Sequence, residues 1–311
     1  MQLKNYERWE DTAVDLGMAR HPFPGEDTNG EYIVWGTNQA CRVINLDEMS
    51  LSTDPSDRPS GRPSQLQSAM HIVDSGESGA KGGHKVTVVH GMNMADEALP
   101  PYIMFPTKSQ DAANYKLKFQ LLASFRQVPG KFGYSVLRYH DTGFGMNPKG
   151  GMNTAAFHKY VLEHVSILYP DATDFVGQRV LLKLDSGPGR FNVDMLTDLR
   201  ARGFYVFPGV PNGTEVGQEM DQVYAYAKHL NYKNRDALYK ARVKAEGSNA
   251  SLSMSDIGYI IFGSSVPMID GTELRLCDAF DKAFDPEHLQ RARFKCGYLP
   301  STRGSLKSHK I

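Results

Sequence analysis

Hydrophobic and polar residues alternate near the start of the chain in the pattern of a β-strand. Val43, Asn45 and Asp47 fall on one face of this strand, and Ile44 and Leu46 fall on the other. Two more runs rich in branched and aromatic residues follow it, and three strands in succession predict an antiparallel meander. The expected strands are residues 41–49, 85–94 and 102–105.

In the second half of the chain, apolar residues at helical spacing alternate with two further strands. Asn153 is a good N-cap for a helix that Pro170 ends, and Gly203 is the C-terminal signal of another helix. The expected elements are a helix over 153–170, a strand over 179–185, a helix over 192–202, a strand over 204–207 and a helix over 218–230. This order predicts an α/β fold: a mixed five-stranded sheet, three antiparallel strands and then two parallel ones, flanked by helices.

Composition along the chain indicates three regions. Residues 1–40 are a polar lead-in segment with one short helix, and residues 41–232 form the main domain. Within that domain, residues 54–84 are rich in Ser, Pro, Gly and Asp, which predicts a flexible insertion. Residues 233–311 form a helical C-terminal extension with a basic tail, whose short helices are expected at 233–244, 274–284 and 287–294.

Charge and cysteine content narrow the function classes. The 35 basic and 35 acidic residues give a formal net charge of zero, so no bulk attraction to nucleic acid or to a membrane is expected. The three cysteines lack Cys-x-x-Cys spacing, which argues against a disulfide framework or a structural zinc site. No signal peptide and no run of about 20 apolar residues is present, so we expect a protein of the cytoplasm or nucleus.

Three acids share a placement that suggests metal chemistry. Asp185 ends an apolar strand before a glycine-rich turn, Asp47 is expected to end the first strand, and Asp221 falls in the first turns of the last core helix. If the first and fourth strands are neighbours, these carboxylates converge, and their repulsion calls for a cation such as Mg²⁺. Two alternatives stay open: Asp185 caps the helix after it, or the three acids are unrelated surface residues.

The motifs around these acids resemble those of one enzyme superfamily. Thirty-five residues separate the second acid from the third. The strings are Asn45-Leu46-Asp47-Glu48, Leu182-Lys183-Leu184-Asp185-Ser186-Gly187-Pro188-Gly189-Arg190 and Pro211-Asn212-Gly213-Thr214-Glu215-Val216-Gly217-Gln218-Glu219-Met220-Asp221. They are most similar to the acid motifs of DDE-superfamily transposases of the pogo and mariner type, whose catalytic domain has a ribonuclease-H-like fold. The resemblance covers about residues 40–303.

This resemblance implies roles for individual residues. Asp47, Asp185 and Asp221 would be catalytic and would together hold two Mg²⁺ (or Mn²⁺) ions. Thr214 and Gln218 would fix a loop without binding metal, and Glu48 stays outside the ligand set because strand alternation turns it to the other face. Phosphate contacts would come from local basic residues: Arg190, Arg62, Lys149, Lys233 and Arg235.

The implied function is that of a metal-dependent DNA endonuclease and strand-transfer catalytic domain. Its partner would be DNA, as transposon ends and target, with a homodimer left open, and it would reside in the nucleus of a eukaryote. Relatives carry helix-turn-helix modules before the first acid, whereas about forty residues precede Asp47 here, so a truncated or domesticated derivative is also expected. Glu215 stands where many relatives have His. Two other functions remain as alternatives: a catalytically idle DNA-binding module, and another metal-dependent phosphohydrolase on the same fold.

Overall fold

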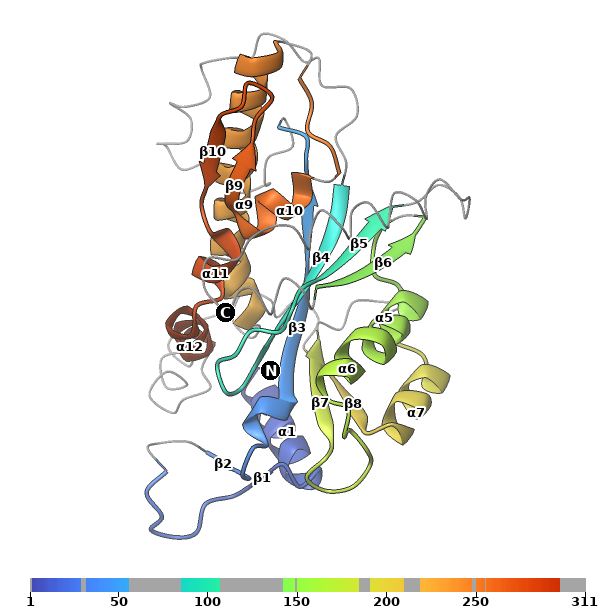
Figure 1. Cartoon of the computed structure of the whole chain (residues 1–311). Helices are drawn as coiled ribbons and strands as arrows, with labels where there is room; N and C mark the ends of the chain where they lie inside the picture. The colour runs from blue at the N-terminus through green and yellow to red at the C-terminus, as the bar shows by residue number, and fades with distance from the viewer. Residues whose placement is uncertain are drawn as a thin grey trace.

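The fold is built around a six-stranded mixed sheet with the strand order β6-β5-β4-β3-β7-β8, which Figure 1 shows curling between two groups of helices. The computed structural model describes residues 2–28, 32–55, 85–106, 142–148, 150–184, 191–209, 219–247, 250–254 and 256–296. The strands of this sheet are β3 (Val43–Ser52), β4 (Lys85–Asn93), β5 (Tyr102–Pro106), β6 (Gly143–Asn147), β7 (Val180–Leu184) and β8 (Phe204–Pro208).

The pairing of the strands agrees with most of the predicted topology. β3, β4 and β5 are joined as antiparallel neighbours, and β7 and β8 are parallel to β3 and to each other. The prediction that the first and fourth strands are neighbours is therefore confirmed, since β3 pairs with β7. The count of five strands is wrong, because β6 adds a sixth strand parallel to β5 at the edge of the sheet.

β6 escaped prediction because two of its inward positions carry no side chain. A Cβ at Gly143 would lie 2.5 Å from atoms of Tyr102 and His164, and a Cβ at Gly145 would lie 2.3 Å from the sulfur of Met104. Only glycine permits this close approach of the strand to its neighbours. The same glycines remove the alternation of side chains by which a strand is recognised in a sequence.

Helices cover both faces of the sheet. The cap predicted at Asn153 is present, since its Oδ1 accepts from Ala156 N at 2.8 Å. A second cap, which was not predicted, is Asn192, whose Oδ1 accepts from Met195 N at 2.8 Å at the start of α7 (Val193–Ala201). The helical elements are α1 (Gln2–Asp15), the 3₁₀ turn η1 (Ala40–Arg42), α5 (Thr154–Tyr160), the π-helical η2 (Val161–Val165), α6 (Ser166–Leu168), α7 (Val193–Ala201), α9 (Glu219–Glu246), α10 (Asp256–Phe262), α11 (Ala279–Ala283) and α12 (Pro286–Lys295).

Alternate residues of β3 belong to two separate hydrophobic cores, one on each face of the sheet. Met49 and Leu51 pack with Val223 and other residues of α9, α10 and α11 on one face. Ile44 and Leu46 pack with residues of α5, η2 and α7 on the opposite face. A third cluster joins α1 to the starts of β3 and β7. Asp47, two residues from both Asn45 and Met49, therefore belongs to the face that α9 covers.

The C-terminal part of the chain differs from its predicted elements. A single helix, α9, runs where two separate helices were expected on either side of residue 232. The prediction of a helix from residue 274 is wrong at its start, because residues 274–276 belong to β10 (Glu273–Leu276), which pairs with β9 (Ser264–Pro267) in an antiparallel hairpin. A second small pair joins β1 (Ala19–Arg20) to β2 (Val34–Trp35). Most of the predicted insertion, residues 56–84, lies outside the described residues.

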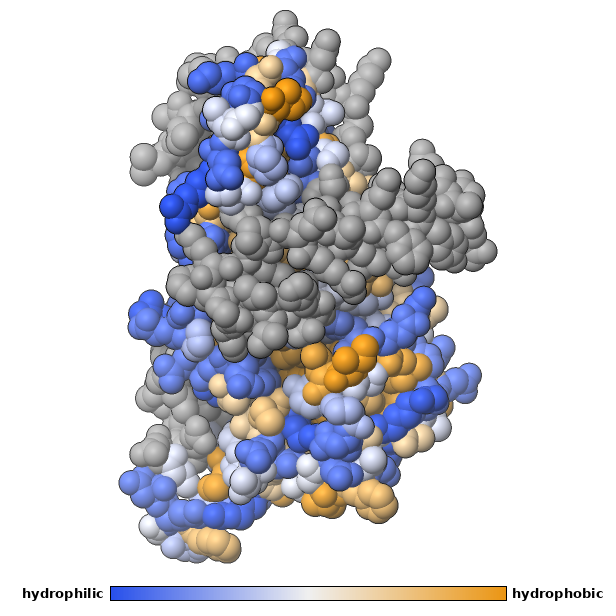
Figure 2. Space-filling model, viewed as in Figure 1, coloured by the Kyte–Doolittle hydropathy of each residue, from blue (hydrophilic) through white to orange (hydrophobic). Residues whose placement is uncertain are grey.

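The described surface is largely polar. In the view of Figure 2, hydrophilic residues dominate over the β9–β10 hairpin, which lies in front of α9, and hydrophobic residues gather beside the sheet near α5 and α6. Large exposed apolar side chains include Ile167 on α6 and Val193 on α7. Among the helices that the structure describes, none has both the length and the apolar character needed to cross a membrane.

Candidate functional site

The candidate site lies where β7 ends beside the middle of β3. Asp47 is half-buried in β3, and its Oδ1 accepts from the backbone N of Glu48 at 2.7 Å. The strand continues past Asp47 to Ser52 because β4 pairs with it throughout, so the prediction that Asp47 ends its strand is wrong. β7 stops at Leu184, directly before Asp185, which lies outside the described residues.

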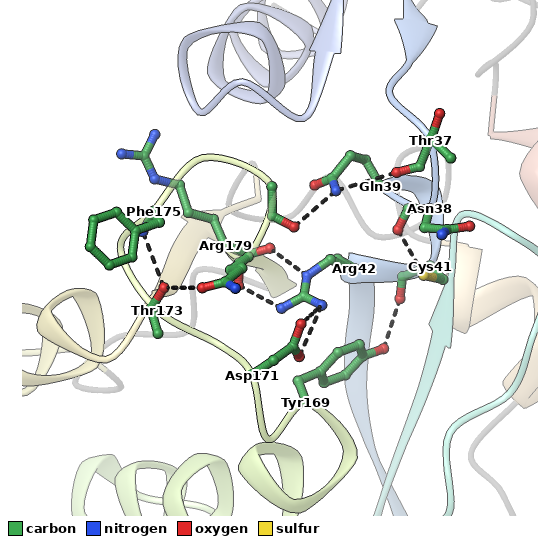
Figure 3. Close-up of polar contacts among 12 residues, drawn as sticks. Thr37, Asn38, Gln39, Cys41, Arg42, Tyr169, Asp171, Thr173, Phe175 and Arg179 are labelled. Carbon is green, nitrogen blue, oxygen red and sulfur yellow. Dashed lines mark hydrogen bonds and ion pairs between the residues drawn. The ribbon is translucent and has the colours of Figure 1, made fainter.

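A network at the start of both strands sets their register (Figure 3). The guanidinium of Arg42, just before β3, donates to the carbonyls of Gln178 at 2.5 Å and Arg179 at 3.1 Å, just before β7. It also forms an ion pair with Asp171 at 3.0 Å. Tyr169, the residue after α6, donates its Oη to the carbonyl of Cys41 at 2.7 Å, so the connection between α6 and β7 is also bound to η1.

The register fixed in this way aligns the two acid motifs. Asn45 on β3 is paired with Lys183 on β7 in the parallel ladder. Asp47 follows Asn45 by two residues, and Asp185 follows Lys183 by the same interval in the sequence. Because the two strands are parallel, the chain runs in the same direction along both of them as it approaches each acid motif.

The first turn of α9 is attached to both strands through one buried carboxylate. Glu219 Oε2 accepts from Asn45 Nδ2 at 2.9 Å and from Lys183 Nζ at 3.1 Å. Glu219 is 1% exposed and Lys183 is 5% exposed, so this ion pair is shielded from water. Asp221, half-buried, lies in the same turn of α9. Acidic residues are favoured in a first turn because they face the positive end of the helix dipole.

Tyr224, one turn further along α9, ties the helix to the backbone of the acid-bearing strand. Its hydroxyl donates to the carbonyl oxygen of Asp47 and accepts from the backbone N of His90, on β4, at 3.2 Å. His90 is the residue opposite Asp47 in the antiparallel ladder. The third acid therefore lies on a helix that is bound to the strand of the first acid.

The electrostatics of the site reflect burial and crowded negative charge. Burial raises the pKa of Tyr224 well above its usual range, and the charges of Asp47 and Glu48 raise it further. Burial also raises the pKa of the Cys296 thiol, and the nearby carboxylates of Glu219 and Asp221 add to this shift. Negative charge therefore gathers around the first turn of α9, where the ammonium of Lys183 is the buried counter-charge.

The donor chemistry at this end of the sheet suits a hard divalent cation. Asp47 and Asp221 both present carboxylate oxygens, the ligands that Mg²⁺ and Mn²⁺ prefer, and neither side chain is fully buried. Within the described ranges, no group of three or more His, Cys, Asp or Glu side chains is placed to hold a metal ion. The predicted set includes Asp185, which is outside those ranges, so the two described acids represent only part of it.

Comparisons with known proteins give distant structural similarity. No protein-family model matches the chain, and no curated protein matches it. The Mos1 transposase paired-end complex with the left transposon end has a TM-score of 0.30 and 12% identity, covering 71% of this chain and 52% of that one. The Mos1 strand transfer complex has a TM-score of 0.31 and 10% identity, covering 84% and 55%. This chain thus spans little more than half of those transposase chains, and the functional proposal rests on the site itself.

The described structure tests two of the five predicted DNA contacts. Lys233 is exposed on α9 and is available to a phosphate. Arg235 is 1% exposed and donates to the carbonyls of Asp54 at 2.7 Å and Pro55 at 3.3 Å, so its predicted contact with DNA is wrong. The remaining predicted contacts and loop residues lie outside the described part of the chain: Arg62, Lys149, Arg190, Thr214 and Gln218.

Sequence reasoning missed the residues that hold the site together. The sequence patterns assign no role to Lys183, Glu219 or Tyr224, although Lys183 and Glu219 lie inside the acid motifs. One signal was present: Lys183 is the single charged residue in the apolar strand Val180–Leu184, and a charge in such a strand requires a buried partner. The identity of that partner could not be read from the sequence.

Proposed function

We propose that this chain is the catalytic domain of a metal-dependent DNA endonuclease and strand-transfer enzyme of the DDE type, on a ribonuclease-H-like fold. The observation that carries the proposal is the attachment of three motif-bearing elements at one end of the sheet. β3 and β7 are parallel neighbours, and the first turn of α9 is hydrogen-bonded to both. Asp47, Asp185 and Asp221 follow the attachment points by two residues each.

In this proposal Asp47, Asp185 and Asp221 would hold two Mg²⁺ or Mn²⁺ ions. Bound as a pair, such ions activate a water molecule and stabilise the leaving oxygen of a phosphodiester. The chain's own task is to hold the carboxylates at fixed positions, with Tyr224 and Glu219 fixing α9 against the sheet. Lys233, exposed further along α9, would contact a DNA phosphate.

The decisive experiment is DNA nicking by the purified chain. Supercoiled plasmid, and a linear duplex bearing the terminal repeats of the element, would be incubated with Mg²⁺ or Mn²⁺. We expect metal-dependent nicking, and a loss of about 100-fold or more in Asp47→Asn, Asp185→Asn and Asp221→Asn, because each variant removes a metal ligand. Asp194→Asn, on the exposed surface of α7, is the matched control and should nick as the unchanged chain does.

One outcome would refute the proposed site, and two others would each favour a rival function. Nicking by Asp185→Asn at the unchanged rate would refute the assignment of the site. A chain that neither nicks DNA nor binds Mn²⁺ in calorimetry would instead be an idle DNA-binding module. An intact site should bind Mn²⁺ and gain thermal stability through linkage. Hydrolysis of a small phosphate ester without action on DNA would favour a phosphohydrolase of another class.

A further inference from the structure

A triad of buried polar residues joins β3, β7 and α9 beside the candidate site. Asn45, Lys183 and Glu219 come from β3, β7 and α9, and they are 3%, 5% and 1% exposed. Both contacts converge on one atom, Glu219 Oε2, at 2.9 Å from Asn45 Nδ2 and 3.1 Å from Lys183 Nζ. Each member precedes one predicted metal ligand by two residues.

Stability alone is a weak reason for this arrangement. Removing two charges from water is costly, and a well-packed apolar pair is often as stable as a buried ion pair. The surroundings are suited to an apolar pair, because Lys183 lies in a strand whose other residues are apolar and near the ring of Trp9, 5.9 Å from its centroid. Directional bonds differ from apolar packing in one respect: they fix distance and orientation between the elements they join.

Because each triad residue lies two positions before a predicted metal ligand, the directional bonds of the triad also restrict the positions of those acids. Residues two apart on a strand point to the same face about 7 Å apart. Fixing Asn45 relative to Lys183 therefore fixes β3 and β7 one step before Asp47 and Asp185 in sequence. Glu219 and Asp221 share the first turn of α9, so holding Glu219 limits the rotation and sliding of Asp221.

We propose that Asn45, Lys183 and Glu219 form a positioning triad that sets the mutual placement of the metal-binding acids without touching the metal. This inference rests on the proposed function, since it assigns the triad to the same site. It predicts that metal affinity depends on the ion pair itself and not only on the stability of the fold.

The test compares the thermal stability of the metal-free chain with its Mn²⁺ affinity in calorimetry, using the full chain throughout. Lys183→Met or Glu219→Met alone removes one charge of the buried ion pair and leaves the opposite charge in the core, so it should lower Tm by about 10 °C. The double variant Lys183→Met/Glu219→Met removes both charges and should recover more than half of that loss in Tm; the remaining deficit is the cost of Asn45 Nδ2, which loses its Glu219 acceptor. The Mn²⁺ affinity of the double variant should nevertheless remain about 10-fold or more weaker, because the directional contacts are gone.

Arg242→Met is the matched control. It breaks the ion pair between Arg242 and the buried Asp256, at 2.6 Å, in the distal half of α9. We expect a lower Tm with unchanged Mn²⁺ affinity, since that pair is not attached to the acid-bearing strands. Asn45→Ala keeps the charges and removes only the β3 contact, so it gives the same test if the double variant does not fold: its Mn²⁺ affinity should also fall.

The outcomes separate this inference from the proposed function. If the unchanged chain binds Mn²⁺ through Asp185, but the double variant or Asn45→Ala binds it equally well, the positioning triad is refuted and the proposed function stands. If the unchanged chain binds no Mn²⁺, the proposed function fails and the inference fails with it.

Discussion

Tyr224→Phe removes a single buried hydroxyl that joins α9 to two neighbouring strands. Tyr224 is 2% exposed, and its hydroxyl bridges the carbonyl of Asp47 and the backbone N of His90. Phenylalanine keeps the ring and its packing, so the change isolates the two hydrogen bonds. Each is worth about 1 kcal/mol net, and water cannot replace the lost partner in the core, so we expect a loss of about 2–3 kcal/mol in the free energy of unfolding.

Urea unfolding measures this loss, and a second tyrosine supplies the control. The urea midpoint of Tyr224→Phe should fall while the slope of the transition stays unchanged, because the surface exposed on unfolding is nearly the same. Tyr205 Oη donates to Asp174 Oδ1 at the protein surface, so Tyr205→Phe should cost less than about 0.5 kcal/mol. Equal midpoints for the two variants would show that the Tyr224 hydroxyl does not bridge α9 to the sheet.

Alkaline pH gives an independent check on the same residue. The pKa of Tyr224 is raised in the folded chain by burial and by the charge of Asp47, whereas an unfolded tyrosine ionises near pH 10. Above about pH 10 the unfolded chain loses this proton first, so the stability that the group contributes below that pH falls as pH rises. The unchanged chain should therefore lose more stability than Tyr224→Phe above pH 10, and parallel curves would contradict the assignment.

Three further predictions concern a buried histidine and two basic residues of α9. Burial lowers the pKa of His90 to about 3, so this residue should reduce the free energy of unfolding by about 2 kcal/mol between pH 7 and pH 5, as pH drops below the unfolded value near 6.5. Urea midpoints should show this loss, and His90→Leu should make it smaller by about that amount. Lys233→Ala should reduce the salt dependence of DNA binding by about one charge without altering stability. Arg235→Met should instead cost about 2–3 kcal/mol, since it removes the buried hydrogen bonds that the guanidinium donates to the carbonyls of Asp54 and Pro55, and it should leave the salt dependence unchanged.

Local patterns were sufficient to predict most of the main sheet and its helices. The strands of the meander, the cap at Asn153 and the pairing of β3 with β7 all follow from periodicity, turn residues and element order. Failures occurred where a distant element overrides the local signal. β3 continues past Asp47 because β4 pairs with it, and β6 forms from glycines that make room for Tyr102 and Met104.

The contacts that hold the site together depend on residues that are remote along the chain. Lys183 and Glu219 are 36 residues apart, and Asn45 and Glu219 are 174 apart. A lysine in a buried strand predicts that a carboxylate is needed, but nothing local says which one. The predicted contact of Arg235 with DNA failed for a related reason, since its position in a basic run hid the fact that the helix turns it into the core.

The short ladder between β3 and β7 explains why two polar networks flank it. Among the described residues, three pairs define the register: Val43–Leu181, Ile44–Leu182 and Asn45–Lys183. A slip of one residue would turn every side chain of one strand to the other face and would separate Asp47 from the acid motif of β7. Apolar packing discriminates poorly against such a slip, because the residues of β7 on both faces are mostly apolar. Arg42 at the start of the ladder and Lys183 at its end form bonds that only one register permits, so the alignment of the acids is specified by polar contacts rather than by the strand pairing itself.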